Sequence, residues 1–214
     1  MTFLEHIFAH LEKSSTAPVL REVRDGQVVS ATGGQLLSLV QQARAFLRSR
    51  DLKIADRCAL LASNSIRWAA LDLAMMAEGI LVVPLYARQA PTELVAMLKD
   101  SDPTRIFCSD VALAAQMQKL WPAAPHITLI DTVFPDDAPL PPAPVHHADS
   151  DPLAIVYTSG TSGEAKGVIL TAGNLNHIIQ CTTARLDQLM LARKHSDATP
   201  DRIFHYAPFC FAAS

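Results

Sequence analysis

The stretch that decides the fold reads Tyr157-Thr158-Ser159-Gly160-Thr161-Ser162-Gly163-Glu164-Ala165-Lys166-Gly167-Val168. It lies between two short apolar runs, 153–157 and 168–170, that are typical of strands. Glycine leaves the backbone amides unobstructed, hydroxyls and amides donate hydrogen bonds to phosphate oxygens, and Lys166 adds a positive charge. The stretch therefore predicts a strand–loop–strand unit that binds a polyphosphate.

This stretch is not a Walker A loop. That motif needs a glycine, four further residues and then Gly-Lys-Ser/Thr at the start of a helix. Counting from Gly160, the position that requires the second glycine is Ala165, and Lys166 is followed by Gly167. The chain then continues into a strand-like run rather than a helix. A different class of phosphate loop is indicated.

Upstream of the loop, apolar runs alternate with segments of helical periodicity. A hairpin is expected first, with its turn at Asp25-Gly26; strands then follow at 57–62, 80–83, 104–108 and 127–130, and helices at 36–47, 66–78, from 91 onward and at 111–120. Downstream, we expect a long helix from about Gly173 and a last strand over 203–211. Strand–helix alternation produces parallel strands joined by helical crossovers. The predicted fold class is α/β, with mostly parallel sheet flanked by helices.

One segment breaks this alternation. Residues 134–152 hold six of the fourteen prolines and show neither helical nor strand periodicity. Such a segment is typical of an extended surface connector. We therefore divide the chain into an N-terminal α/β subdomain (1–133), a Pro-rich connector (134–152), and the phosphate-loop segment with the start of a following α/β subdomain (153–214).

The composition argues against several classes of protein. Lysine and arginine number 18 against 21 aspartates and glutamates, and no basic run of five occurs, which disfavours nucleic acid as a partner. The four cysteines show no CxxC spacing, so we expect reduced thiols in a cytoplasmic protein. No signal peptide and no apolar run long enough to span a bilayer are found. The His146-His147 pair has no third ligand at metal spacing and is expected to be solvated, and no metal site is expected in the chain.

The loop resembles the signature loop of the adenylate-forming (AMP-binding) superfamily. That signature is Thr-Ser-Gly-Ser/Thr-Thr-Gly-x-Pro-Lys-Gly-Val, and eight of its ten specified positions match between Thr158 and Val168. The departures are Ser162, which keeps a hydroxyl where threonine is usual, and Ala165, which replaces the usual proline. The superfamily includes acyl-CoA synthetases, luciferases and peptide-synthetase adenylation domains.

The resemblance extends along most of the chain. Similar motifs are the strand entry at 55–61, the Asn-Ser-x-x-Trp helix start at 64–68, the Ala-x-Gly-x-x-Val-Val-Pro-Leu run at 77–85, with Glu78 in place of a glycine, and the Leu-Thr-x-x-Asn-Leu segment at 170–175. The last is the segment 206–211, which resembles the family's Tyr-Leu-Pro-Leu-x-His edge of the acyl pocket. Phe211 stands where the family motif has histidine.

The resemblance implies an AMP-forming acyl-CoA synthetase, with this chain as part of the large N-terminal domain. The enzymes condense a carboxylic acid with ATP to acyl-AMP and pyrophosphate and then transfer the acyl group to CoA; Mg²⁺ bridges the phosphates. The implied phosphate-binding residues are Thr158, Ser159, Gly160, Thr161, Ser162, Gly163 and Lys166, and the implied edge of the acyl pocket is His205, Phe209 and Phe211. The family's catalytic residues correspond to positions beyond 214, so the chain by itself is expected to be inactive.

Two alternatives stay open from the sequence. One is an acyl-AMP ligase or peptide-synthetase-type adenylation unit that loads a carrier protein instead of CoA. The other is a truncated domain without catalysis that persists as a folded unit, self-associating through exposed core surface. The residues do not specify the length of the acyl chain or the thiol acceptor.

Overall fold

The computed structural model describes residues 2–159, 165–192, 205, 207, 209 and 210. The elements follow one another as α1 (Phe3–Lys13), β1 (Pro18–Arg24), β2 (Gln27–Thr32), α2 (Gly33–Ser49), β3 (Arg57–Leu61), α3 (Ile66–Ala77), β4 (Leu81–Leu85), α4 (Pro91–Ser101), β5 (Arg105–Cys108), α5 (Val111–Leu120), β6 (Ile127–Leu129), a 3₁₀ turn η1 (Ile130–Thr132), β7 (Pro152–Ser159), β8 (Ala165–Thr171) and α6 (Ala172–Ala192). Within the described part of the chain, no helix combines the length and the apolar character needed to cross a membrane.

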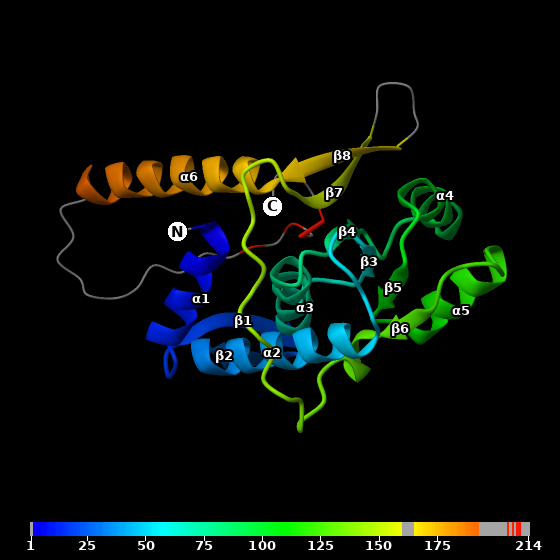
Figure 1. The fold of residues 1–214 in the computed structure, drawn as a ribbon, viewed down its shortest axis with the longest axis horizontal. Helices are drawn as coiled ribbons and strands as arrows, with labels where there is room; N and C mark the ends of the chain where they lie inside the picture. Colours follow the sequence, from blue (N-terminus) through cyan, green and yellow to red (C-terminus); the bar gives the residue numbers. More distant parts are fainter. Residues whose placement is uncertain (1, 160–164, 193–204, 206, 208, 211–214) are drawn as a thin grey trace.

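A six-stranded sheet organises the molecule (Figure 1). Its strand order is β6-β5-β3-β4-β7-β8, and every neighbouring pair is parallel except β7–β8. The crossovers that carry α3, α4 and α5 make β3, β4, β5 and β6 parallel, and β7, reached through the segment after η1, joins β4 in the same direction. The predicted α/β class with a mostly parallel sheet is confirmed.

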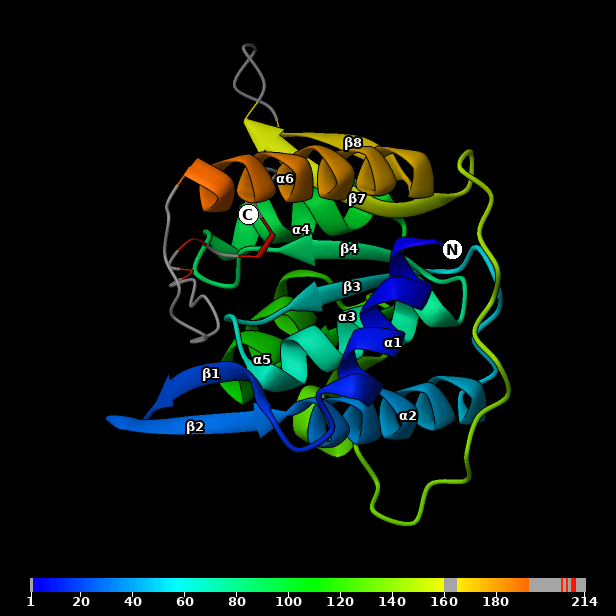
Figure 2. The same cartoon turned by 90° about the vertical axis from the view of Figure 1, so that its left-hand side faces the viewer.

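Helices cover both faces of this sheet (Figure 2). Successive side chains of a strand point to opposite faces, and β3 shows the consequence. Cys58 and Leu60 belong to the core under α2 and α3, whereas Ala59 and Leu61 belong to the core under α4 and α5. A strand buried on both faces reads as an uninterrupted apolar run, which is why the sequence indicated it so clearly.

The helix α1 and the hairpin β1–β2 precede α2 and the six-stranded sheet. The hairpin β1–β2 is antiparallel, and its turn residues Asp25 and Gly26 both have positive φ, as the Asp-Gly pair predicted. The helix α1 was not expected from the sequence. Its start is a capping box, in which the amide of Glu5 donates to the Thr2 hydroxyl (3.3 Å) and the amide of Thr2 donates to the Glu5 carboxylate (2.8 Å).

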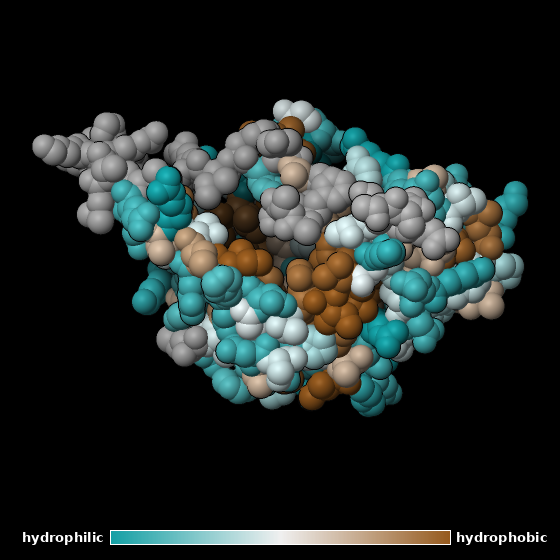
Figure 3. Space-filling view, turned by 90° about the horizontal axis from the view of Figure 1, so that it is seen from above, coloured by the Kyte–Doolittle hydropathy of each residue, from teal (hydrophilic) through white to brown (hydrophobic). Residues whose placement is uncertain are grey.

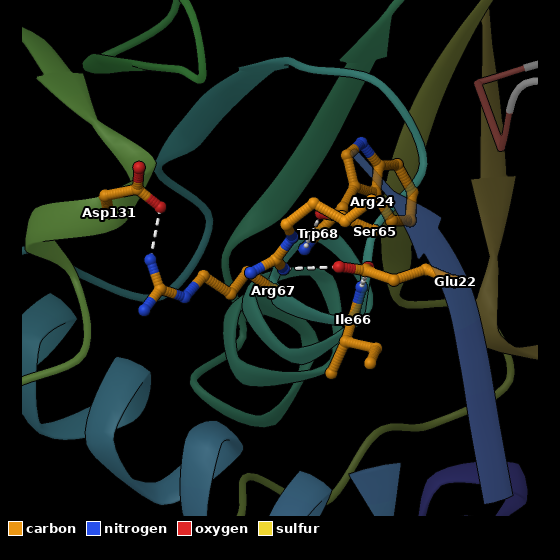
Figure 4. Close-up of polar contacts among 7 residues, drawn as sticks. All are labelled: Glu22, Arg24, Ser65, Ile66, Arg67, Trp68 and Asp131. Carbon is orange, nitrogen blue, oxygen red and sulfur yellow. Dashed lines mark hydrogen bonds and ion pairs between the residues drawn. The ribbon is translucent and has the colours of Figure 1, made fainter. Parts of the chain in front are cut away.

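The helix α3 is fixed at both ends. The amide of Trp68 donates to the Ser65 hydroxyl (3.0 Å), so Ser65 is the N-cap of this helix. The carboxylate of Glu22 on β1 accepts from the free amide of Ile66 (2.6 Å), as Figure 4 shows. At the other end Gly79 adopts φ +72°, a conformation that glycine tolerates best.

The segment 134–151 forms no helix or strand, yet it is bound to the body of the protein. The amide of Val145 donates to the carbonyl of Ala77 (2.8 Å), and the His147 ring nitrogen Nε2 lies 2.8 Å from the carbonyl oxygen of Met76. His147 is 6% exposed, so the expectation that both histidines of the pair are solvated is wrong for His147. The carbonyls at the C-terminus of α3 need donors, and the connector supplies them.

Candidate functional site

The phosphate-loop stretch forms the turn end of the β7–β8 hairpin. Thr158 is directly opposite Lys166, and Ser159 is opposite Ala165. The predicted strand–loop–strand arrangement is therefore present, although both strands reach further into the stretch than the apolar runs indicated. Gly160, Thr161, Ser162, Gly163 and Glu164 lie outside the described residues.

The hairpin is attached to the helix α4 at the root of the loop. The Tyr157 hydroxyl donates to the carbonyl of Met97 (3.0 Å) or to the carboxylate of Asp100 (2.5 Å). Burial, followed by the hydrogen bond to Asp100, raises the pKa of the Tyr157 phenol well above its usual range. Across the hairpin stands Gly167, where a Cβ atom would lie 2.9 Å from a methyl of Ile155 and 3.3 Å from the Tyr157 ring. Glycine at this position lets Tyr157 pack at the base of the loop.

The two described polar side chains nearest the turn face solvent. Thr158 and Lys166 are both exposed, and the ammonium of Lys166 makes no ion pair or hydrogen bond with any residue that the structure describes. An uncompensated ammonium beside a hydroxyl, on a hairpin anchored at its base, is suited to bind an anionic oxygen.

The segment expected at the edge of an acyl pocket is held at the carboxyl end of β3. The Asn64 side chain donates from Nδ2 to the carbonyl of Ala207 and accepts from the amide of Phe209, both at 2.8 Å. The Phe209 ring packs against Trp68 and stacks on His205, with 5.0 Å between ring centroids in each pair. Phe211 and most of the strand expected over 203–211 lie outside the described residues.

The loop and this aromatic segment meet the same edge of the sheet. β3, β4 and β7 run parallel, so their carboxyl ends lie together, and Figure 2 shows the arrowheads of β3 and β4 directed toward the C-terminal segment. In open α/β sheets the carboxyl ends of the strands are where ligands bind. The structure therefore gathers Thr158 and Phe209 on one edge, 51 positions apart in the sequence.

Asn64 is the functional candidate that the sequence missed. The Asn-Ser-x-x-Trp motif indicated only the start of a helix here, and in the structure the Asn64 side chain binds the aromatic segment. The available signal was that Ser65 already provides a cap, which leaves the neighbouring amide group free for another partner.

Comparison with known proteins agrees with this geometry. Residues 8–214 match the model of the AMP-binding enzyme family. The chain belongs to that family. The resemblance inferred from the loop is thereby confirmed for nearly the whole chain.

Relatives among AMP-binding enzymes include ligases of both kinds considered above. The chain is 26% identical over 190 residues to the long-chain-fatty-acid–CoA ligase FadD15 of Mycobacterium bovis, covering 81% of this chain and 32% of that protein. It is 33% identical over 161 residues to nonribosomal peptide synthetase 7 of Gibberella zeae, covering 72% of this chain and 3% of that protein. The chain thus spans about a third of the length of the fatty-acid ligase.

Solved structures of AMP-binding enzymes share the fold. The o-succinylbenzoate CoA synthetase of Bacillus subtilis, in complex with its acyl-adenylate intermediate, superposes with a TM-score of 0.71 at 18% identity over 87% of this chain and 46% of that one. The N-terminal domain of FACL13 from Mycobacterium tuberculosis gives 0.67 at 25% identity over 80% of this chain and 45% of that one. The fold described above is therefore that of the N-terminal domain of adenylate-forming ligases.

Proposed function

We propose that the chain is the ATP-phosphate-binding portion of an AMP-forming acyl-CoA synthetase. The observation that carries the proposal is the β7–β8 hairpin, which presents Thr158 and Lys166 side by side within a matching signature loop, both exposed and without a carboxylate partner among the described residues. The proposed phosphate ligands are Thr158, Ser159, Thr161, Ser162 and Lys166, with the backbone amides around Gly160 and Gly163.

The chemistry that this loop supports is the departure of pyrophosphate. The carboxylate oxygen of the acid attacks the α-phosphorus of ATP, the bond to the β-phosphate oxygen breaks, and acyl-AMP and pyrophosphate result. Both reactants are anionic, so positive charge and hydrogen-bond donors on the leaving phosphates lower the barrier. Lys166 supplies the charge, and Mg²⁺ enters as the counter-ion that ATP carries on its phosphates.

The acid is proposed to approach along the aromatic segment. His205, Phe209 and Phe211 form the proposed edge of the acyl pocket, and Trp68 supports Phe209 from α3. An aromatic wall suits a hydrophobic acid. The thiol acceptor in the proposal is CoA, which attacks the acyl-AMP carbonyl and releases AMP.

A second candidate is an adenylation unit that loads a carrier protein. The identity to nonribosomal peptide synthetase 7 over 161 residues favours it. Both candidates share the first half-reaction and differ in the thiol. Under either, we place the protein in the cytoplasm, with subdomains 1–133 and 153–214 joined by the connector 134–152.

The isolated chain is proposed to be inactive, because it spans about a third of the length of the fatty-acid ligase that it resembles. On its upper face, brown apolar residues are exposed (Figure 3). Val168, Ile169 and Ile178 are each between 46% and 57% exposed on β8 and α6. Exposed apolar area of this kind favours association, so we propose that the chain by itself forms homo-oligomers.

The test measures ATP–pyrophosphate exchange on the whole protein with acids of several chain lengths. CoA and a phosphopantetheinylated carrier protein are then compared as acceptors of the acyl group. Exchange that depends on a fatty acid, followed by thioester formation with CoA, supports the first candidate; transfer to the carrier alone supports the second. Absence of exchange with every acid and amino acid tested overturns both.

A further inference from the structure

Two pockets on the described surface contain arginine pairs, and they differ in charge. One lies beside the β1–β2 hairpin and is lined in part by Arg24 and Arg67. Both arginines already have carboxylate partners, Glu22 and Asp131 respectively, as Figure 4 shows. Their charges are compensated within the protein, so this pocket offers an anion little attraction.

The second pocket has a volume of about 340 Å³ and lies where α2 ends beside β5 and β6. Its polar lining comes from Arg50, Arg105, His126, Thr128 and Thr132. Arg105 is the first residue of β5, and His126 directly precedes β6. The pocket therefore lies toward the amino ends of the parallel strands, at the opposite edge of the sheet from the phosphate loop.

Neither arginine of this pocket has a counter-charge in the described part of the chain. No carboxylate oxygen of a described residue lies within 4.0 Å of Arg50 or Arg105. The Arg50 guanidinium instead lies over the Phe46 ring, 4.7 Å from its centroid. Stacking on an aromatic face orients a guanidinium and leaves its N–H groups directed outward around the ring edge.

Arg105 is held in place but incompletely satisfied. Its Nη1 donates to the Thr128 hydroxyl (2.9 Å), while its buried Nε has no hydrogen-bond partner among the described residues. A buried donor without an acceptor destabilises the fold, and an anion that accepts from it removes that cost. Burial, followed by the positive charge of Arg50, lowers the pKa of the Arg105 guanidinium. The two cations thus repel each other across the pocket.

We propose that this pocket binds a phosphate group, either inorganic phosphate or the phosphate of a small monoester. A dianion matches the two uncompensated arginines, and its tetrahedral oxygens accept from several donors at once. His126 and the hydroxyl of Thr128, which accepts from Arg105 and keeps its own proton to donate, add donors to the lining. The Phe46 ring and Ile127 give the pocket an apolar wall, against which the organic part of a monoester packs. This site is separate from the ATP loop and does not depend on the proposed function.

Binding is tested by titrating the ¹⁵N-labelled chain with inorganic phosphate and, in a second arm, with glycerol 3-phosphate. The arginine Nε–Hε resonances report the contact, and that of Arg105 is the most specific because its Nε is buried. We expect a saturable shift of the Arg105 signal. Arg50→Gln is expected to weaken binding about tenfold, as loss of one charge-assisted hydrogen-bonding group implies, and Arg50→Lys to restore part of it.

A matched control separates this site from general electrostatics. Arg21→Gln removes the same charge from an exposed position on β1 and should leave the affinity unchanged. Arg50 is exposed at the end of α2, so its variants should keep the wild-type melting temperature. Tighter binding in one arm identifies the free ion or the monoester as the ligand. Shifts that never saturate, or that weaken equally in Arg21→Gln, overturn the proposal.

Discussion

The side chain of Asn64 forms two hydrogen bonds with the backbone on either side of residue 208. It accepts from the amide of Phe209 and donates to the carbonyl of Ala207, each at 2.8 Å. The side-chain amide of Asn64, in the turn after β3, thus binds two residues that lie 143 and 145 positions further along the chain. Both the donor and the acceptor of the side-chain amide are used, so a carboxylate would keep only the acceptor and an aliphatic side chain would keep neither.

Replacing Asn64 by alanine should release the aromatic segment while leaving the sheet intact. Two partly buried hydrogen bonds are lost, and we expect the free energy of unfolding to fall by about 1–2 kcal/mol. Hydrogen exchange followed by mass spectrometry should show faster exchange at the Phe209 amide. Asn64→Asp keeps the acceptor for Phe209 and is expected to retain that protection. Unchanged exchange in Asn64→Ala would show that other contacts fix the segment.

Glu78 forms a buried ion pair whose loss should be severe. Its carboxylate accepts from Arg44 Nε (2.8 Å) and Arg48 Nη1 (2.9 Å), and the side chains of Glu78 and Arg44 are 8% and 6% exposed. Arg44 also donates to the carbonyl of Pro142 (2.7 Å), which joins α2 to the connector. Glu78→Ala leaves the guanidinium buried without a counter-charge, and we expect a loss of about 3–5 kcal/mol in urea unfolding.

The matched control is the exposed pair of Arg67 and Asp131. Asp131 is 78% exposed in its side chain, so Asp131→Ala should change the free energy of unfolding by less than about 1 kcal/mol. Equal effects of the two substitutions would mean that water reaches Glu78 and that the pair is not buried in solution.

Asp72 on α3 predicts a pH-dependent stability. Burial raises the pKa of its carboxyl to about 7, whereas the pKa of an aspartate in the unfolded chain is about 3.9. The folded chain therefore retains a proton that the unfolded chain has released. Stability from this proton is fully present below about pH 4 and is lost as the pH rises from about 4 to about 7.

The size of this effect follows from the shift. Each pKa unit corresponds to about 1.4 kcal/mol, but Asp72 is partly exposed, so solvent reduces the loss to about 2 kcal/mol. Urea unfolding at pH 4.5 and pH 8 should show that Asp72→Asn loses less stability with rising pH than the unsubstituted chain does. Asp187→Asn, at an exposed position on α6, should follow the unsubstituted chain. Parallel profiles for all three proteins would refute the raised pKa of Asp72 in the folded chain.

Local patterns predicted the elements of this fold apart from α1, whereas the long-range pairings between elements were not predicted. Apolar runs identified β3 and β4 because strands buried on both faces have few polar residues. The strand order of the sheet required knowledge of which strands pair. Burial of His147 also escaped prediction, because its acceptor is a carbonyl 71 positions away.

In the candidate site too, local motifs were predictable from the sequence and long-range contacts were not. The signature loop was visible because phosphate binding needs its residues close together in sequence. The anchor between Tyr157 and Asp100 was not visible, since the two residues meet only when β7 packs beside α4. In the sequence, Glu78 was only a departure from the family motif. The structure shows that Arg44 and Arg48 compensate the charge of its carboxylate. The roles of Ser162 and Phe211 stay predictions.

Lys166 should be required for adenylation and dispensable for folding. It is exposed on β8 opposite Thr158 and makes no ion pair with a described residue, so its removal leaves no cavity and no unpaired partner. In the whole protein, Lys166→Ala should lower ATP–pyrophosphate exchange by about a hundredfold, as expected for loss of a charge on the leaving phosphates. The melting temperature should change by less than about 2 °C.

Two further variants make this result specific to the loop. Lys166→Arg keeps a positive charge on a longer, branched group and should recover part of the exchange activity. Lys119→Ala removes an equally exposed lysine from the last turn of α5, away from the hairpin, and should leave exchange unchanged. A fall in melting temperature with exchange preserved would reverse the assignment, because Lys166 would then act in the fold and not on the phosphates. Loss of exchange in Lys119→Ala as well would mean that overall charge, and not the hairpin, governs ATP binding.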